Sequence, residues 1–287
     1  MACTAENQEA NALSLRRIMV RTQSVDNTRI ISSGMSSILD HPLITARYFF
    51  PRREILRDAF IVESGDVSLA CYHHAPHREA RTVVYFHGNG EVVAECVELM
   101  AEPFANLGLN SFFVEYRGYG MSSGVPELGA MLDDVPKAIA ALGIPQQELI
   151  LFGRSVGSIY AFHATQHFPK VAGLVIESGV ADPLERLLLR VAPEEMGLTL
   201  DELTSEVRLR LNHQRLLAGF YRPTLFMHTR YDGLIDVDSA ERMHAWANDP
   251  KDLLVFERGD HNSILMVNFE PYMAKLKHFV ESLDGSR

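Results

Sequence analysis

Three residue types that together can perform nucleophilic catalysis lie far apart in this sequence. Ser155 occurs in residues 153–157, G-R-S-V-G, which fit the pattern G-x-S-x-G. A serine hydroxyl becomes an effective nucleophile when a base takes its proton, and neutral imidazole can do so near neutral pH. A carboxylate on the other imidazole nitrogen fixes the tautomer and stabilises the imidazolium. Asp232 and His261 follow Ser155 in that order, so the set is available if the fold brings the three together.

The sequence around Ser155 predicts how this side chain is positioned. Residues 149–152, L-I-L-F, are apolar without interruption and predict a strand covered on both faces. Helical spacing of apolar residues then runs from Val156 to Phe168, which places Ser155 on a sharp turn between strand and helix. Backbone N–H groups at the helix start suit an oxygen that becomes negative. The alternative is a glycine-rich turn without catalytic function.

An alternation of strands and helices continues from residue 82 to the end of the chain. Two strands at 59–63 and 67–72, joined by the turn S-G-D, predict a hairpin that precedes this part. Further strands are predicted at 83–86, 112–114, 149–152, 171–176, 224–227 and 253–256. Helices are predicted at 92–107, 128–142, 159–168, 239–246 and 264–283. This order predicts an α/β fold with a mostly parallel sheet of about eight strands and helices on both faces.

Polar and glycine-rich segments follow the predicted strands. In parallel sheets the ligand site lies beyond the carboxyl ends of the strands, so these segments are expected to meet at one edge. They are H-G-N-G (87–90), E-Y-R-G-Y-G (115–120), Ser155, H-T-R-Y-D (228–232) and E-R-G-D-H-N (257–262).

The chain resembles the α/β-hydrolases over about residues 58–283. Four motifs carry this resemblance: H-G-N-G, E-Y-R-G-Y-G, G-R-S-V-G and G-D-H-N. The resemblance is to the subgroup of serine-aminopeptidase-like hydrolases and protein depalmitoylases, and it implies the α/β-hydrolase fold. It implies Ser155 as nucleophile, Asp232 as acid and His261 as base, in the chain order of these enzymes. The backbone N–H groups of Asn89 and Val156 would form the oxyanion hole.

Other assignments of these roles stay open in the sequence. The acid could instead be a neighbouring or preceding carboxylate: Asp236, Asp238, Glu177 or Asp182. Asp260, beside His261, is expected to be a loop or capping residue. For Arg117 and Arg154 a structural or solvated guanidinium is favoured over a contact with a substrate carboxylate.

Two parts of the chain lie outside the predicted repeat of strands and helices. Residues 181–221 form an insertion of at least two helices, which would hang over the carboxyl edge as a small cap or simply cover the sheet. Residues 1–55 are expected to form an N-terminal extension, its first residues mobile, before the domain of residues 56–287. In the aromatic run 48–50, packing on the domain is favoured over contact with an acyl chain or lipid.

Composition narrows the class of protein. The 287 residues, 47% of them apolar, suit one domain with a large core, and the net charge of −10 argues against nucleic acid or an anionic membrane as the main partner. No stretch resembles a signal peptide or a membrane span, and Cys3, Cys71 and Cys96 form no metal or disulfide pattern. The histidines of residues 73–77 lack the ligands that would complete a metal site. A cytoplasmic protein without metal or cofactor is therefore expected.

The function expected from the sequence is hydrolysis of a carboxylic ester or thioester through an acyl-enzyme. The partner would be a small-molecule or acylated substrate. An amide or peptide hydrolase is the alternative within the class, and a ligand-binding protein that has lost turnover is the alternative outside it. Acyl length, leaving group, physiological substrate and oligomeric state stay open.

Overall fold

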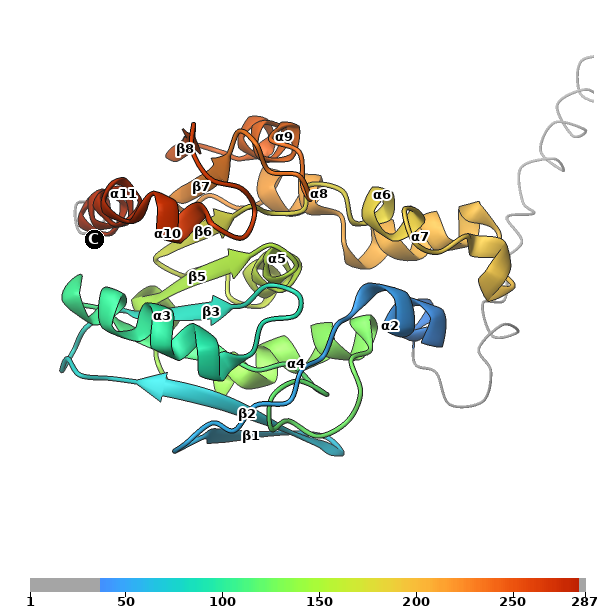
Figure 1. Ribbon diagram of the computed structural model, residues 1–287, viewed down its shortest axis with the longest axis horizontal. Helices are drawn as coiled ribbons and strands as arrows, with labels where there is room; N and C mark the ends of the chain where they lie inside the picture. Colours follow the sequence, from blue (N-terminus) through green and yellow to red (C-terminus); the bar gives the residue numbers. More distant parts are fainter. Residues whose placement is uncertain (1–36, 284–287) are drawn as a thin grey trace, which may run out of the picture. The chain divides into compact units, whose positions relative to one another are not determined.

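The computed structural model describes residues 37–283, and in this part of the chain eight strands form one sheet (Figure 1). Their order is β1-β2-β4-β3-β5-β6-β7-β8. The pairs β1–β2 and β2–β4 are antiparallel, and all later pairs are parallel. The predicted mostly parallel sheet is thus confirmed. The strands are β1 (Phe60–Ser64), β2 (Val67–His74), β3 (Thr82–Phe86), β4 (Asn110–Val114), β5 (Leu149–Arg154), β6 (Gly173–Glu177), β7 (Thr224–Thr229) and β8 (Lys251–Phe256).

The uninterrupted apolar runs of the central strands supply two cores, one on each face of the sheet. Along β3, Val84 and Phe86 belong to one core, whereas Val83 and Tyr85 belong to the other. Successive side chains of a strand point to opposite faces, so a strand that is covered on both needs apolar residues throughout.

The helices divide between these two faces. α3 (Val93–Asn106) and α11 (Phe269–Ser282) contribute to one core, and α4 (Leu128–Ala140), α5 (Gly157–His167) and α9 (Asp238–Trp246) contribute to the other. Helices on both faces are therefore confirmed. Within the described residues, no helix is both long enough and apolar enough to cross a bilayer.

Some predicted boundaries are wrong. The helix expected over 264–283 is two helices, α10 (Ile264–Val267) and α11, separated at Asn268. The Asn268 backbone, at φ −120° and ψ 26°, departs from helical values, and its side chain donates to the carbonyls of Arg258 and Ile264, both at 2.9 Å. β6 begins at Gly173 rather than at residue 171. Val171 is fully buried, which made it look like part of the strand, but it lies in the loop before β6.

The insertion between β6 and β7 consists of α6 (Pro183–Leu188), the 3-10 turn η4 (Pro193–Met196), α7 (Leu200–Arg210) and α8 (His213–Ala218). Figure 1 shows α6 and α7 beyond the end of the sheet to which the parallel strands point, next to α2 (Pro42–Tyr48). Arg47 of α2 forms an ion pair with Glu195 at 2.6 Å. The segment before β1 and the insertion thus contact each other over this edge.

The described part of the predicted N-terminal extension contains α2 and the short turn η2 (Ile38–Asp40). Leu39 and Ile44 of these elements are fully buried in the same core as α4 and α5. The remainder of the extension, residues 1–36, lies outside the described residues, as does Cys3.

Candidate active site

Ser155 lies on a strained turn between β5 and α5. Its φ is +53°, in the left-handed region that non-glycine residues rarely adopt. The turn is held by a hydrogen bond from the Ser155 N–H to the Glu177 carbonyl at 2.8 Å. A Cβ on Gly157 would lie 2.1 Å from the Phe86 carbonyl oxygen. Only glycine therefore lets α5 start this close to β3.

Ser155, His261 and Asp232 form a continuous chain of hydrogen bonds. Ser155 Oγ lies 2.9 Å from His261 Nε2, and His261 Nδ1 lies 2.7 Å from Asp232 Oδ2. All three residues are less than 10% exposed, at 9%, 5% and 8% respectively. The ends of β5, β7 and β8 thus bring together residues that are up to 106 positions apart in the sequence.

Asp232 is fixed as an ionised acceptor. Its Oδ1 accepts hydrogen bonds from the backbone N–H groups of Leu234 at 2.9 Å and Ile235 at 2.8 Å. Burial alone would raise the pKa of Asp232, but the hydrogen bond with His261 and those from the backbone lower it overall. A carboxylate that is held in this way can stabilise a positive charge on the imidazole.

The other carboxylates that the sequence left open have different partners. Asp236 accepts from the N–H of Asp238 at 2.9 Å, and Asp182 accepts from two N–H groups at the start of α6. Glu177 ends β6, with its carboxylate against Arg154 and the Tyr272 hydroxyl. Asp260 accepts from the N–H groups of its own loop.

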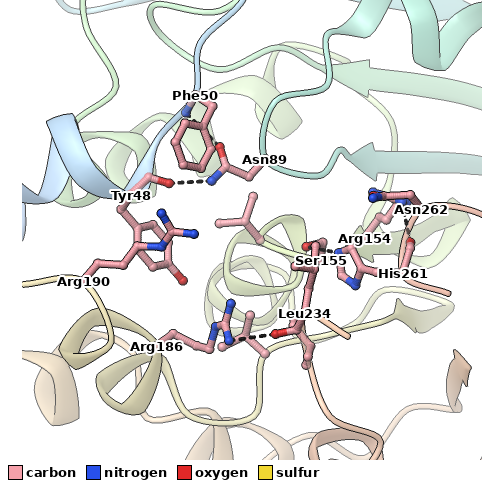
Figure 2. Close-up of a pocket in the computed structure, with 13 residues that line it drawn as sticks. Tyr48, Phe50, Asn89, Arg154, Ser155, Arg186, Arg190, Leu234, His261 and Asn262 are labelled. Atoms are coloured by element: carbon pink, nitrogen blue, oxygen red, sulfur yellow. Dashed lines mark hydrogen bonds between the residues drawn. The ribbon is translucent and has the colours of Figure 1, made fainter. Parts of the chain in front are cut away.

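Asn89 and Val156, the predicted oxyanion residues, both line the pocket that contains Ser155. Within residues 37–283, neither backbone N–H donates to a backbone carbonyl. The Asn89 side chain fixes its loop: Oδ1 accepts from the Phe50 N–H at 3.0 Å, and Nδ2 donates to the Tyr48 carbonyl (Figure 2). Among the described residues, therefore, no backbone carbonyl competes for these two N–H groups with an oxygen bound in the pocket.

A buried ion pair supports the loop that carries Asn89. His87 Nε2 lies 2.8 Å from Glu115 Oε1, and His87 Nδ1 lies 2.8 Å from the Gly88 carbonyl oxygen. Burial lowers the pKa of His87, but the carboxylates of Glu115 and Glu91 and the hydrogen bond to the Gly88 carbonyl together outweigh burial, so that the pKa is raised overall. Both ring nitrogens then donate, and the H-G segment is anchored to the end of β4.

Arg154 connects three parts of the site, a role that the sequence did not reveal. Its guanidinium forms ion pairs with Glu91 and, at 3.0 Å, with Glu177. Glu91 in turn accepts the Gly88 N–H at 2.7 Å, so Arg154 links the serine turn to the loop of Asn89. Arg117 is also structural, because it binds Asp134 through two hydrogen bonds of 2.7 Å.

The pocket beside Ser155 has a volume of about 260 Å³. Val180, Leu234 and Ile235 form part of its apolar wall. Tyr48 and Phe50, from the aromatic run for which packing was favoured, also line it, although Tyr48 is largely buried. Two further residues, Arg186 of α6 and Arg190 just after it, reach the pocket from the insertion (Figure 2).

No part of the site suggests a bound metal. Within residues 37–283, no group of three or more His, Cys, Asp or Glu side chains is arranged to hold a metal ion. His73 and His74 belong to β2, which extends two residues further than predicted, and Cys71 and Cys96 are free and buried.

Comparison with known proteins gives one family model and several relatives. The model of serine aminopeptidase S33 matches residues 76–215. YfhR of Escherichia coli is 27% identical over 187 residues, which cover 63% of this chain and 62% of YfhR. The match thus spans less than two thirds of that relative. The α/β hydrolase domain-containing protein WAV2 of Arabidopsis thaliana is 25% identical over 243 residues, 79% of either chain.

Among solved structures, the esterase Pf2001 of Pyrococcus furiosus superposes with a TM-score of 0.64 at 16% identity. The superposition covers 81% of this chain and 96% of the esterase. At this level of identity the likeness shows a common fold.

Proposed function

Because the chain belongs to the α/β-hydrolase superfamily, we propose that it is a serine hydrolase that cleaves a carboxylic ester or thioester. The observation that carries the proposal is the pair of hydrogen bonds from Ser155 to His261, 2.9 Å, and from His261 to Asp232, 2.7 Å. These distances are within the range in which a general base takes a proton from a nucleophile.

The proposed reaction has two stages. Ser155 Oγ attacks the acyl carbonyl while His261 Nε2 takes its proton, and Asp232 stabilises the imidazolium. The N–H groups of Asn89 and Val156 hold the oxyanion, an interaction whose loss typically costs about 3 kcal/mol in the transition state. His261 then protonates the leaving oxygen or sulfur. Water deprotonated by the same imidazole releases the acid and restores Ser155. These steps use no metal and no organic cofactor.

A peptide hydrolase is the second candidate, because the matching family model is that of a serine aminopeptidase. An aminopeptidase must bind the ammonium of its substrate, which calls for a carboxylate near the scissile bond. The 13 described residues that line the pocket include three arginines and no aspartate or glutamate. This wall would repel an ammonium, so the ester or thioester is favoured.

A panel of substrates tests the proposal. We expect the purified protein to hydrolyse p-nitrophenyl acyl esters or acyl thioesters, and Ser155→Ala to abolish turnover while the protein stays folded. Turnover of aminoacyl anilides alone would favour the second candidate. A folded protein that is inert toward all three classes would instead be a ligand-binding member of the fold.

A further inference from the structure

Two arginines of the insertion face the pocket that contains Ser155. Arg186 lies on α6, and Arg190 lies two residues beyond the end of this helix. Both side chains line the pocket, and Figure 2 shows them on the side opposite Ser155 and His261. The insertion therefore contributes two positive charges to the space in which an acyl substrate would bind.

Neither arginine has a carboxylate partner within the described residues. Arg208 and Arg215 of the insertion also lack one within these residues, but they are exposed and do not line the pocket. Other arginines of the same region are paired: Arg47 with Glu195 at 2.6 Å and Arg242 with Glu185 at 3.0 Å. Arg242 also lies within 4 Å of Asp182 and Asp238. These carboxylates near α6 thus face Arg242, whereas Asp236 lines a neighbouring cavity together with Arg186 without forming an ion pair with it.

The contacts of the two arginines orient them but leave donors unused. Arg186 Nη1 donates to the Leu234 carbonyl at 2.9 Å, while its Nε is buried without an acceptor among the described residues. Arg190 lies over the ring of Phe50, 5.4 Å from its centre, and donates to the Arg47 carbonyl at 3.3 Å. Arg186 also hydrogen-bonds the Tyr48 hydroxyl. A guanidinium has five N–H donors, so each arginine still retains donors for a ligand.

None of the described residues that line the pocket is an aspartate or glutamate that could neutralise Arg186 and Arg190. The third arginine of the pocket wall, Arg154, is already paired with Glu91 and Glu177. The pair formed by Arg186 and Arg190 also acts on Tyr48, where it opposes the rise in the hydroxyl pKa that burial causes. The side of the pocket away from Ser155 is therefore a positively charged subsite with a phenol beside it.

We propose that the substrate is an ester or thioester bearing an anionic group, a carboxylate or a phosphate, that binds between Arg186 and Arg190 while the acyl carbonyl lies at Ser155. This inference rests on the proposed function and adds a substrate class to it. Guanidinium groups bind both anions through paired hydrogen bonds. The volume of about 260 Å³ is below the usual 300–1,000 Å³ of ligand sites, which favours a small substrate.

Matched pairs of esters test the inference. One pair places the anion on the acyl side: mono(4-nitrophenyl) adipate and 4-nitrophenyl methyl adipate. The other places a phosphate on the leaving group: 4-acetoxyphenyl phosphate and its dimethyl ester. The readout is the ratio of kcat/KM for the anionic ester to kcat/KM for its neutral partner. We expect at least a tenfold ratio in one pair, as two charge-assisted contacts would give.

Arginine variants test whether the preference for the anionic ester depends on Arg186 and Arg190. Arg186→Gln/Arg190→Gln should reduce the ratio to about one. Arg208→Gln/Arg215→Gln removes the same charge from exposed positions of the insertion that do not line the pocket, and should leave the ratio unchanged. Ratios of one or less in both pairs, or a ratio that survives in the Arg186→Gln/Arg190→Gln variant, would overturn the inference.

A binding measurement separates this inference from the proposed function. If no ester is hydrolysed, the proposed function fails, and thermal shifts by monomethyl adipate and dimethyl adipate decide the inference. A larger rise in Tm with the monoanion, lost in Arg186→Gln/Arg190→Gln, would support the subsite. Equal shifts with the two compounds would refute it.

Discussion

Arg154 Nη2 donates a hydrogen bond to the backbone carbonyl oxygen of His261 at 2.9 Å. The residue directly before the serine thus holds the loop that carries the imidazole. The same guanidinium also binds Glu91 and Glu177. Arg154 therefore contacts all three segments of the site: the serine turn, the loop of His261 and, through Glu91, the loop of Asn89. Arg154 is a positioning residue that acts through His261.

Arg154→Lys tests this role while it keeps the positive charge. A single ammonium cannot reach two carboxylates and the His261 carbonyl together, so His261 should lose alignment with Ser155. A displacement on the order of 1 Å can cost about 100-fold in rate, and we expect kcat to fall roughly 10- to 100-fold with KM changed less than about threefold. Arg230→Lys, at a half-exposed ion pair with Glu257, is the control. Equal kcat values for wild type and Arg154→Lys would contradict the role.

Asp232→Asn tests the choice of acid. Asparagine would keep the geometry but could not stabilise an imidazolium, and the corresponding change in serine proteases lowers kcat on the order of 10⁴-fold. We expect a loss of this order for ester hydrolysis. Asp236→Asn and Asp238→Asn, on neighbouring residues with other partners, should stay within about threefold of wild type. A larger loss in either than in Asp232→Asn would reassign the acid.

Gly157→Ala tests the packing of the serine turn. The added Cβ would lie 2.1 Å from the Phe86 carbonyl oxygen, and backbone on both sides prevents relief. We expect a loss of several kcal/mol in the free energy of unfolding, as found for overpacked sites. Gly233→Ala is the matched control, since a Cβ there meets nothing within 4 Å. Urea denaturation measures both, and similar stabilities would show that the turn can move.

His213 makes stability depend on pH. Burial lowers its pKa from 6.5 to about 4, although Nδ1 contacts the Val180 carbonyl at 2.7 Å. The pKa of His213 is lower in the folded state than in the unfolded state, so the unfolded state binds a proton first as the pH falls. The contribution of neutral His213 to the free energy of unfolding is therefore complete above about pH 6.5 and is lost as the pH falls toward 4. The loss is roughly 3 kcal/mol at 1.36 kcal/mol per pKa unit. The variant His213→Asn should show a flatter dependence of unfolding free energy over this range; an unchanged slope would exclude His213 as its cause.

Much of the fold could be predicted from the sequence because it depends on local patterns. The uninterrupted apolar runs, such as residues 149–152, mark strands covered on both faces, and their alternation with helical segments implies parallel neighbours. Since parallel strands end at one edge, Ser155, Asp232 and His261 could be expected to meet there. In the structure, Ser155 Oγ lies 2.9 Å from His261 Nε2, and His261 Nδ1 lies 2.7 Å from Asp232 Oδ2.

Features that depend on long side chains or on contacts between distant segments could not be predicted. For Arg154 the sequence favoured a structural or solvated guanidinium, but nothing local shows which carboxylates Arg154 reaches or that Arg186 lines the pocket. The break at Asn268 was missed because asparagine is compatible with a helix, and the backbone angles that interrupt it accompany a side-chain bond to the distant Arg258 carbonyl. Tyr48 lies beside the pocket because α2 meets the insertion there.

The most direct test of the account is covalent labelling of Ser155. The wild-type protein is incubated with a fluorophosphonate, which reacts with an activated serine, and the modified peptide is identified by mass spectrometry. We predict one adduct per chain on Ser155, formed more slowly while an ester substrate is present in excess and absent in a folded Ser155→Ala variant. A folded wild-type protein that stays unlabelled, or one labelled equally in Ser155→Ala, would contradict the account.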